Sequence, residues 1–447
     1  MERLTKRSVQ GRVRSLDAYR GFVMLAMASS GIGIAATMNS EAFQSLDSAR
    51  LPSYWTSLWE NLRYQFSHVA WTGCSFWDLI QPSFMFMVGV SMPFSYGRRE
   101  ESGESQTRMF FHVLWRSAIL IALGVFLSSN GRGQTNFTFV NVLTQIGLGY
   151  PLLYLLLRPG FNVQLVTVIA ITIGYSAAFY MYESPEEDLR NVTEYLTEVK
   201  GMDESEWTQF KGSAAHWNKH TNAAAAFDRW FLNLLPSAEE EWRGQRFWVN
   251  RGGYQTLNFI PSLITMILGL MAGGILKGDK TNREKLEWLL AAGAVCLVLG
   301  VLVDTHIWPQ WLRDMTTANW SLCPIVKRIW TPSWAVFSSG WTFWMLAAFF
   351  MSIDMTGQHR WSMPLIVVGM NSIAMYCMSQ MIKPWAARTL KTHLTTLDIW
   401  TGLDPGIIFY LFSSDYAFAP IFEYTSRVFV LWLICVWMYR QKIFIRI

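Results

Sequence analysis

Apolar stretches of roughly 17–20 residues recur along the whole chain, and a helix of that length crosses the roughly 30 Å hydrocarbon core of a bilayer. The pattern predicts an all-α polytopic membrane protein with about ten transmembrane helices. Their approximate ranges are 21–37, 79–96, 110–128, 142–157, 163–181, 257–276, 288–303, 334–353, 364–381 and 418–439. The segment 405–412 is too short to cross, so we expect it to lie at the interface or to re-enter the bilayer.

Basic residues gather at alternate ends of the predicted spans. The cations before the first span are Arg3, Lys6, Arg7, Arg12, Arg14 and Arg20. Later basic positions lie in every second loop and at the C-terminus: Arg98, Arg99, Arg108, Arg158, Lys277, Lys280, Arg283, Lys285, Arg360, Arg440, Lys442 and Arg446. Cytoplasmic loops of membrane proteins are enriched in Lys and Arg. The pattern therefore predicts that both termini are cytoplasmic.

The loops assigned to the far side of the membrane are long. Residues 38–77 precede the second span, and residues 182–254 form a large extracytoplasmic loop inserted between spans five and six. The larger loop is rich in Trp and Asn, and we expect short helices in it, for example at 223–235. We expect residues 1–447 to form a single transmembrane domain that carries this insertion.

The composition agrees with this topology, since 51% of the residues are hydrophobic and 15% are charged. The net charge of +5 implies no nucleic-acid partner, because basic cytoplasmic loops account for it. The lipid bilayer is the expected partner. No Walker-type loop, GxGxxG, GxSxG or HExxH motif occurs where its chemistry would need it, which argues against a nucleotide-hydrolysing pump.

The stretch 68–89 passes from a polar, aromatic loop into the second span. Asp78 heads that span, where a carboxylate is favoured by the helix dipole and caps free backbone N–H groups. His68 precedes it on the predicted far side, and an imidazole suits proton transfer near neutral pH. Asp78 could orient His68 through a hydrogen bond. The alternatives are a loop histidine without a role and an aspartate that only caps the helix.

Ionisable residues inside predicted spans are costly and usually have a function. His112 and Arg116 are four residues apart in span three and share one helix face. They either snorkel to the cytoplasmic interface or form an anion-binding patch suited to the phosphates of a nucleotide-type cofactor. Asp17 and Arg20 open span one, where they form a local ion pair or leave Arg20 free to reach a cofactor phosphate.

Two further sets of polar residues could take part in chemistry. Gln145 and Asn371 are polar within apolar spans, so either amide could donate a hydrogen bond to an oxyanion. His216 and His220 are four residues apart in the large far-side loop, a spacing that suits a metal pair. They have no third ligand nearby in sequence, so we expect no metal.

Several short motifs follow one another in order through most of the chain. They are RSLDAYRG at 14–21, HVAWTG at 68–73, DLIQPSFMFMVG at 78–89, VLTQIG at 142–147, LNFIP at 257–261, PIVKRIWT at 324–331 and GMNS at 369–372. The ordered set resembles the transmembrane acyltransferases typified by lysosomal heparan-α-glucosaminide N-acetyltransferase, together with their bacterial relatives.

This resemblance implies that acetyl-CoA is used from the cytoplasmic side and that an amine of a sugar on the far side is acetylated. His68 matches the position of the family's active-site histidine. The family's functional asparagine near the far end of the first span aligns here with Gly31. The soluble domain that precedes the first span in the lysosomal enzyme is absent, so we expect a bacterial-type relative in a bacterial inner membrane. Whether it forms a homodimer is left open.

We therefore expect a membrane-embedded acetyltransferase for an amine or hydroxyl of a glycan, with His68 as general base or as acyl carrier and Asp78 orienting it. The residues expected to hold acetyl-CoA or to stabilise the oxyanion are Arg20, His112, Arg116, Gln145 and Asn371. Two other classes stay open. A transporter of a small polar solute predicts flux without CoA release, and a non-catalytic membrane scaffold predicts that His68 tolerates substitution.

Overall fold

The computed structural model describes residues 13–46, 52–316, 321–401 and 410–445, and the regular secondary structure in these ranges is helical. Backbone pairing of β type within them is limited to three isolated bridges. The predicted all-α class is confirmed. Four of the predicted N-terminal cations (Arg3, Lys6, Arg7 and Arg12), Arg446 and most of the segment 405–412 lie outside the described residues.

Seven helical segments of the described chain are long and apolar enough to cross a membrane. They are Arg14–Met38, Gln106–Ser128, Phe161–Tyr180, Thr256–Lys277, Asn282–Val303, Pro332–Met355 and Ala419–Arg440. Each coincides with one predicted span.

The other three predicted spans are also helical but differ in length or polarity. Helix α5 (Ile80–Glu101) is long but interrupted by polar residues, and α7 (Val142–Leu155) is short. The span at 364–381 is divided into α15 (Met363–Gly369) and α16 (Ser372–Met381), because the backbone leaves helical geometry at Asn371. The count of ten spans stays a prediction.

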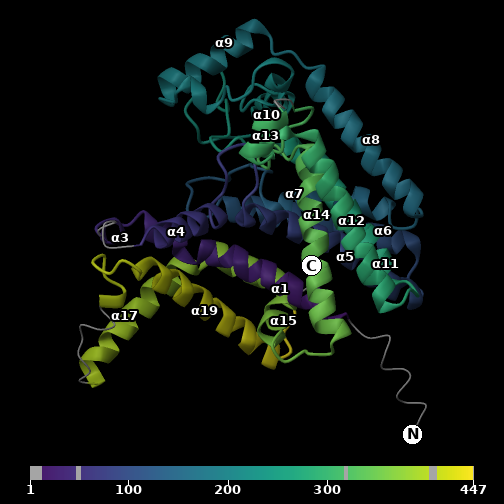
Figure 1. Cartoon of the computed structure of the whole chain (residues 1–447), viewed down its shortest axis with the longest axis vertical. Coiled ribbons are helices and arrows are strands. Elements are labelled where there is room, and N and C mark those ends of the chain that lie inside the picture. Colours follow the sequence, from purple (N-terminus) through teal and green to yellow (C-terminus); the bar gives the residue numbers. More distant parts are fainter. Residues whose placement is uncertain (1–12, 47–51, 317–320, 402–409, 446–447) are drawn as a thin grey trace. The chain divides into compact units, whose positions relative to one another are not determined.

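The chain divides into two compact units, and each is described by itself. Unit 1 comprises Met1–Ser67, Thr281–Leu290 and Phe343–Arg446. Unit 2 comprises His68–Lys280, Ala291–Thr342 and Ile447. Figure 1 shows their helices by label.

Unit 1 is built around the first helix. Its elements are α1 (Arg14–Ser29), η1 (Ser30–Gly33), α2 (Ile34–Met38), α3 (Glu41–Gln44), α4 (Ser53–Gln65), η8 (Phe350–Met355), α15, α16, α17 (Lys383–Thr401) and α19 (Ala419–Arg440), with the ends of two helices shared with unit 2. A Cβ atom on Gly21 would meet the Leu365 carbonyl, and one on Gly369 would meet the Asp17 carbonyl. These two glycines therefore let α1 and α15 pack backbone to backbone.

Unit 2 holds most of the remaining helices. They are η2 (Phe76–Leu79), α5, α6 (Gln106–Ser128), α7, α8 (Phe161–Tyr180), α9 (Glu186–Glu194), η3 (Tyr195–Val199), η4 (Glu204–Glu206), η5 (Gly212–Trp217), α10 (Ala223–Leu232), η6 (Thr256–Asn258), α11 (Phe259–Lys277), α12 (Asn282–Val303), η7 (Thr305–Ile307), α13 (Gln310–Thr316) and α14 (Pro332–Phe349). Helices α5 and α11 lie side by side (Figure 1). A Cβ on Gly269 of α11 would meet the Phe86 carbonyl of α5, so close packing again depends on a missing side chain.

The insertion at 182–254 is folded around aromatic side chains. The Trp217 ring stacks on Phe179 of α8 with centroids 4.4 Å apart, and Trp71 belongs to the same buried cluster. Helix α10 lies where a short helix was predicted. This packing joins the insertion to the loop that carries His68.

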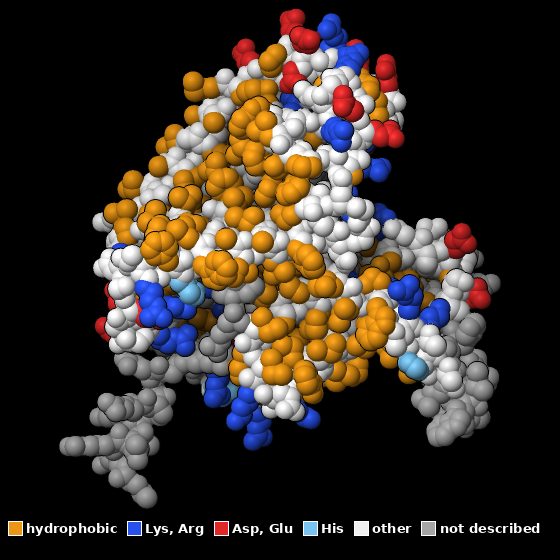
Figure 2. Space-filling view, turned by 180° about the vertical axis from the view of Figure 1, so that it is seen from behind, with side chains coloured by type: hydrophobic (Ala, Val, Ile, Leu, Met, Phe, Trp, Pro, Cys, Tyr) orange, Lys and Arg blue, Asp and Glu red, His pale blue; other side chains and the backbone are white. Residues whose placement is uncertain are grey.

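The outer helix faces of unit 2 are apolar. Side chains such as Phe126 on α6, Val166 on α8 and Val298 on α12 are more than half exposed. Figure 2 shows apolar side chains spread over one face, with charged side chains gathered at the end that carries α9. Exposed apolar surface on helices of this length is typical of lipid contact.

Candidate active site

The turn at the head of α5 places Asp78. The Ser75 hydroxyl accepts a hydrogen bond from the Asp78 backbone N–H, and an Asp78 carboxylate oxygen accepts one from the Ser75 N–H at 3.3 Å. This reciprocal pair is a capping box, which satisfies N–H groups that have no helical partner. Asp78 therefore caps the helix as predicted. It also has one carboxylate oxygen facing away from the turn.

That second oxygen meets His68. His68 Nδ1 lies 2.7 Å from Asp78 Oδ1, and the Val69 N–H donates to Oδ2 at 3.2 Å. A charged carboxylate only accepts, so in the neutral ring Nδ1 carries the proton and Nε2 keeps its lone pair. The His68 side chain is 44% exposed whereas that of Asp78 is 1% exposed. The imidazole is thus held through Nδ1 by a buried carboxylate, while its side chain is about half-exposed.

Lys327, a residue for which the sequence predicts no role, completes the cluster. Its Nζ donates to Asp78 Oδ1 at 3.1 Å and lies 3.1 Å from His68 Nδ1. The Lys327 side chain is 4% exposed, so this ion pair is almost completely removed from water. A buried charge needs such a partner, because an unpaired one is strongly unfavourable.

The electrostatics of the pair favour a charged carboxylate. Burial alone would raise the pKa of Asp78, but the hydrogen bond with His68 and the positive charge of Lys327 outweigh it and hold that pKa far below its usual range. Burial lowers the pKa of Lys327, and the Asp78 charge opposes that shift. Asp78 therefore keeps a negative charge at neutral pH and can stabilise a protonated imidazole.

Backbone contacts hold the Lys327 loop against the His68 loop. The Gly73 N–H donates to the Ile325 carbonyl at 3.0 Å, next to a bridge between Thr72 and Val326. The Ile325 N–H in turn donates to Asp304 Oδ2 at 2.7 Å. Two segments far apart in the sequence are thus fixed in register beside the imidazole.

Asp304 also pairs with a histidine. Its Oδ1 lies 2.8 Å from His306 Nδ1, a second pairing of an aspartate with a histidine. No lysine joins this pair within the described residues. Asp304 contacts the Lys327 loop by accepting a hydrogen bond from its backbone, so we assign Asp304 a positioning role.

Sequence signals for Lys327 existed. It stands in PIVKRIW, a run that is otherwise apolar apart from Arg328, within a loop predicted on the far side. Two adjacent cations there run against the enrichment of Lys and Arg on the cytoplasmic side. A cation that breaks this rule in an apolar segment therefore predicts an acidic partner elsewhere in the chain.

Arg328 contacts both the His68 loop and the end of the large insertion. Its guanidinium donates to the Gly252 carbonyl at 2.8 Å and lies 5.8 Å from the centre of the Tyr254 ring. A longer bond of 3.4 Å reaches the Val69 carbonyl, next to His68. The end of the large insertion is therefore connected to the His68 loop by one side chain.

The predicted phosphate-binding residues His112 and Arg116 both lie on α6, within unit 2. His112 Nε2 is 2.9 Å from an Arg99 nitrogen, and the Arg116 guanidinium lies 4.7 Å from the centre of the Tyr150 ring. Arg99 also pairs with Glu104 at 3.1 Å. The structure thus adds Arg99 to the predicted patch, where its guanidinium donates to the unprotonated Nε2 of His112.

The amide of Gln145 is already engaged. Its nitrogen donates to the Phe139 carbonyl at 2.6 Å and to the Thr256 carbonyl at 3.1 Å. These bonds tie the start of α7 to η6. To bind an oxyanion, the Gln145 nitrogen would have to give up one of these two hydrogen bonds. That role stays a prediction.

Arg20, Asn371 and Gly31 belong to unit 1. Arg20 pairs with Asp17 at 3.4 Å, as the local ion-pair alternative expects. The Asn371 amide donates to the Ile443 carbonyl and accepts from the Ile445 N–H, each at 3.0 Å. Gly31 has a φ of 73°, in a left-handed turn that ends α1. Glycine and asparagine are the residues that adopt this conformation most readily.

No group of three metal-ligating side chains occurs among the described residues. His216 Nδ1 faces the Tyr182 carbonyl at 3.2 Å, and the ring of His220 is buried. The predicted acetyl transfer has no step that needs a metal.

Comparisons with known proteins agree with the motifs. A family model described as the catalytic part of heparan-alpha-glucosaminide N-acetyltransferase matches residues 52–192. The chain is 24% identical to the mouse (Mus musculus) protein named heparan-alpha-glucosaminide N-acetyltransferase over 409 residues, which cover 83% of this chain and 54% of that protein. It is 24% identical to the human (Homo sapiens) protein of the same name over 422 residues, which cover 88% and 57%.

The chain thus spans about half the length of the curated relatives it matches. The resemblance inferred from the motifs is confirmed, and it supports an acetyltransferase. The matched segment 52–192 contains His68 and Asp78, whereas Lys327 lies beyond it.

Proposed function

We propose that this chain is a membrane-embedded acyltransferase that moves an acetyl group from cytoplasmic acetyl-CoA to an amine or hydroxyl of an extracytoplasmic sugar or glycan. The observation that carries the proposal is the His68 imidazole, half-exposed and held by the buried Asp78–Lys327 pair. An imidazole whose Nδ1 proton is held by a carboxylate has Nε2 free to accept a proton or an acyl group.

Two routes use the same arrangement. In the first, Nε2 removes a proton as the acceptor nitrogen or oxygen attacks the acetyl carbon, the C–S bond breaks, and the proton passes to the departing CoA sulfur. In the second, Nε2 attacks the acetyl carbon and releases CoA, and the acceptor then takes the acetyl group from the ring. In both, the Asp78 carboxylate stabilises the ring while it carries positive charge.

The proposed topology has ten spans with cytoplasmic termini, so the acetyl group moves from one side of the bilayer to the other. On the cytoplasmic side, Arg116 of unit 2 and, separately, Arg20 of unit 1 would each bind a CoA phosphate through charge-assisted hydrogen bonds, and His112 would assist Arg116 as a hydrogen-bonding group. Arg99 joins them through its contact with His112. The insertion at 182–254 would shape the acceptor side.

The test is acetyl transfer by the full chain in membranes. His68→Ala should abolish transfer from labelled acetyl-CoA to amino-sugar acceptors, whereas His393→Ala, an exposed histidine of α17, should leave it unchanged. Full activity of His68→Ala would refute the assignment. Trapping labelled acetyl on His68 after rapid quenching would favour the second route.

The same preparation separates the alternative classes. A transporter would move a small polar solute across vesicles without releasing CoA. A scaffold would release no CoA and would show no thermal stabilisation by acetyl-CoA. Either result would exclude the acyltransferase.

A further inference from the structure

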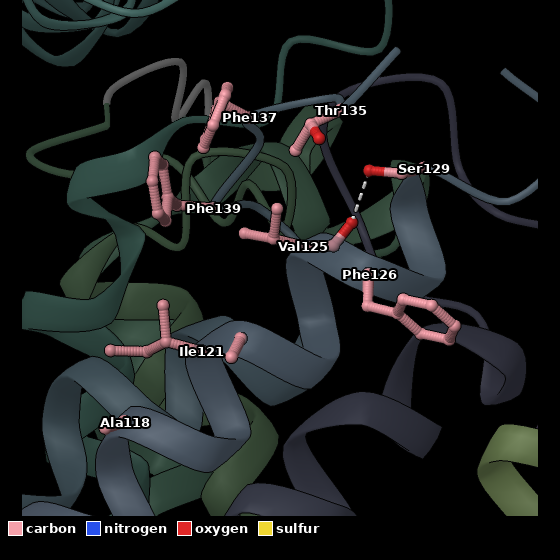
Figure 3. Close-up of a pocket in the computed structure, with 9 residues that line it drawn as sticks. Ala118, Ile121, Val125, Phe126, Ser129, Thr135, Phe137 and Phe139 are labelled. Atoms are coloured by element: carbon pink, nitrogen blue, oxygen red, sulfur yellow. Dashed lines mark hydrogen bonds between the residues drawn. The ribbon is translucent and has the colours of Figure 1, made fainter. Parts of the chain in front are cut away.

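An apolar groove of about 660 Å³ runs along the outer side of α6. Its walls include Ala118, Ile121, Val125 and Phe126 from the helix, and Phe137 and Phe139 from the segment that follows it. Figure 3 shows Phe137 and Phe139 alongside Val125 and Ile121, so the segment after the helix returns over the groove. Phe126 is 59% exposed, which agrees with a groove open to the surroundings.

The groove is about as long as one lipid leaflet is thick. The lining positions 118–129 span about 16 Å of helix at 1.5 Å per residue, close to half of the roughly 30 Å hydrocarbon core. In the proposed topology this half of α6 lies toward the extracytoplasmic side. An apolar chain from the outer leaflet would therefore fit the groove along its length.

A second, polar cavity of about 820 Å³ adjoins the groove, since Thr135 and Phe137 line both. It lies between the segment after α6 and the large insertion. Its charged lining residues are the cations Arg132, Lys200 and Arg251 and the acids Asp228 and Glu239. Within the described residues, none of the three cations forms an ion pair with an acid.

The two acids do not balance the cations. Burial raises the pKa of Asp228 from its ordinary value to about 7, so this carboxyl is partly neutral at physiological pH. Both of its oxygens face the Thr256 N–H, at 3.0 and 3.2 Å. The cavity is therefore positive overall. Its other polar lining groups include the side chains of Gln134, Asn136 and Asn250, which can hydrogen-bond to hydroxyls.

We propose that the groove and the cavity together bind an anionic glycolipid, with its apolar chain along α6 and its sugar headgroup among Arg132, Lys200 and Arg251. A groove alone would hold any lipid chain, and a cavity alone would suit a soluble sugar. The shared residues Thr135 and Phe137 join the two into one amphipathic site. The cavity volume lies in the range of small-molecule sites, larger than a lone phosphate requires.

The site adjoins the His68 loop through the backbone. Asn250 and Arg251 line the cavity, and the next residue, Gly252, accepts the hydrogen bond from Arg328 that also reaches Val69. The sugar would therefore lie on a segment that Arg328 connects to the His68 loop. This consequence rests on the proposed function, whereas binding itself does not.

The experiment measures lipid retention by native mass spectrometry of the full chain in detergent. The probes are glucuronosyl diacylglycerol, its neutral counterpart glucosyl diacylglycerol, and phosphatidylglycerol; soluble glucuronic acid is tested by thermal shift. Wild type should retain the glucuronosyl lipid about tenfold better than the other two lipids, a difference of roughly 1.4 kcal/mol. His68→Ala should bind equally well, so lost catalysis and lost binding remain distinguishable.

Two variants with matched controls locate the site. Ala122→Trp should fill the groove and abolish this preference, whereas Val166→Trp, on the exposed face of α8, should not. Arg132→Gln combined with Arg251→Gln should remove the preference for the anionic headgroup, and Lys211→Gln should keep it. Variants are compared only if their thermal unfolding matches wild type; the retention order of wild type alone already decides the proposal.

Three outcomes would overturn it. Equal retention of phosphatidylglycerol would reduce the site to general lipid packing. Equal retention of the neutral glycolipid would show that the cations select nothing. Glucuronic acid stabilising the protein as well as the glycolipid does would indicate a soluble sugar site.

Discussion

Replacing Asp78 by Asn tests the central arrangement, because the change keeps the size of the side chain and removes its charge. The carboxylate accepts five hydrogen bonds: His68 Nδ1–H and Lys327 Nζ reach Oδ1, and the Val69 N–H and the N–H and hydroxyl of Ser75 reach Oδ2. An asparagine has one oxygen and one NH₂ group, so it can satisfy only one of these two sets.

The orientation that preserves more bonds points the asparagine oxygen at Val69 and Ser75. Its NH₂ group then faces His68 Nδ1, which must become an acceptor, and the proton moves to Nε2. The nitrogen that should act as base or nucleophile is then blocked. Loss of an orienting aspartate of this kind lowers turnover on the order of 10⁴-fold.

The same substitution leaves Lys327 buried without a carboxylate. Breaking a buried ion pair on one side costs about 3–5 kcal/mol of unfolding free energy. Adding Lys327→Met removes the stranded charge and should recover most of that loss, because a neutral pair of similar volume is tolerated. Turnover should stay low in the double variant, since the imidazole is still misoriented.

The assays are transfer of labelled acetyl from acetyl-CoA to an amino sugar, and thermal unfolding of the purified chain. Asp415→Asn, an exposed aspartate, serves as the control. Turnover of Asp78→Asn within tenfold of wild type would refute the role of Asp78. A double variant no more stable than Asp78→Asn would show that Lys327 does not depend on this carboxylate.

Three other predictions follow from single contacts. Gly269→Ala should lower the unfolding free energy by about 1–3 kcal/mol, because its Cβ would meet the Phe86 carbonyl. Gly274→Ala should not, because no atom lies within 4 Å of the added Cβ. Equal stability of the two variants would contradict the close packing of α5 and α11. Burial raises the pKa of Asp228 to about 7, so the stabilisation of the fold by its neutral form is complete below about pH 4 and is lost as pH rises through 7. Asp228→Asn should therefore remove the Asp228 contribution to the decline in melting temperature between pH 5 and 8. An unchanged decline would argue against a raised pKa. Arg116→Gln should raise KM for acetyl-CoA about tenfold with little change in kcat, the effect of one charge-assisted bond to phosphate, and an unchanged KM would remove Arg116 from the CoA site.

Local sequence determined the helical class and the placement of Asp78. The length of an apolar run sets whether a helix can span the bilayer, and a Ser-x-x-Asp pattern caps a helix with contacts only three residues apart. His68 was found in the same way, because it and Asp78 share one short loop. Such features depend on neighbours along the chain and can be predicted without knowing the fold.

Tertiary structure alone decided which partner balances Asp78. Lys327 lies 249 residues from Asp78 in the sequence. It reaches the site because the Gly73 N–H and the Asp304 carboxylate form hydrogen bonds with the backbone of its loop. The tertiary structure likewise shows that the Gln145 amide nitrogen donates to two carbonyls. Residue type and spacing do not encode these pairings, since each depends on which distant segments pack together. A buried cation in an apolar loop predicts an acidic partner, and only the tertiary structure identifies that partner.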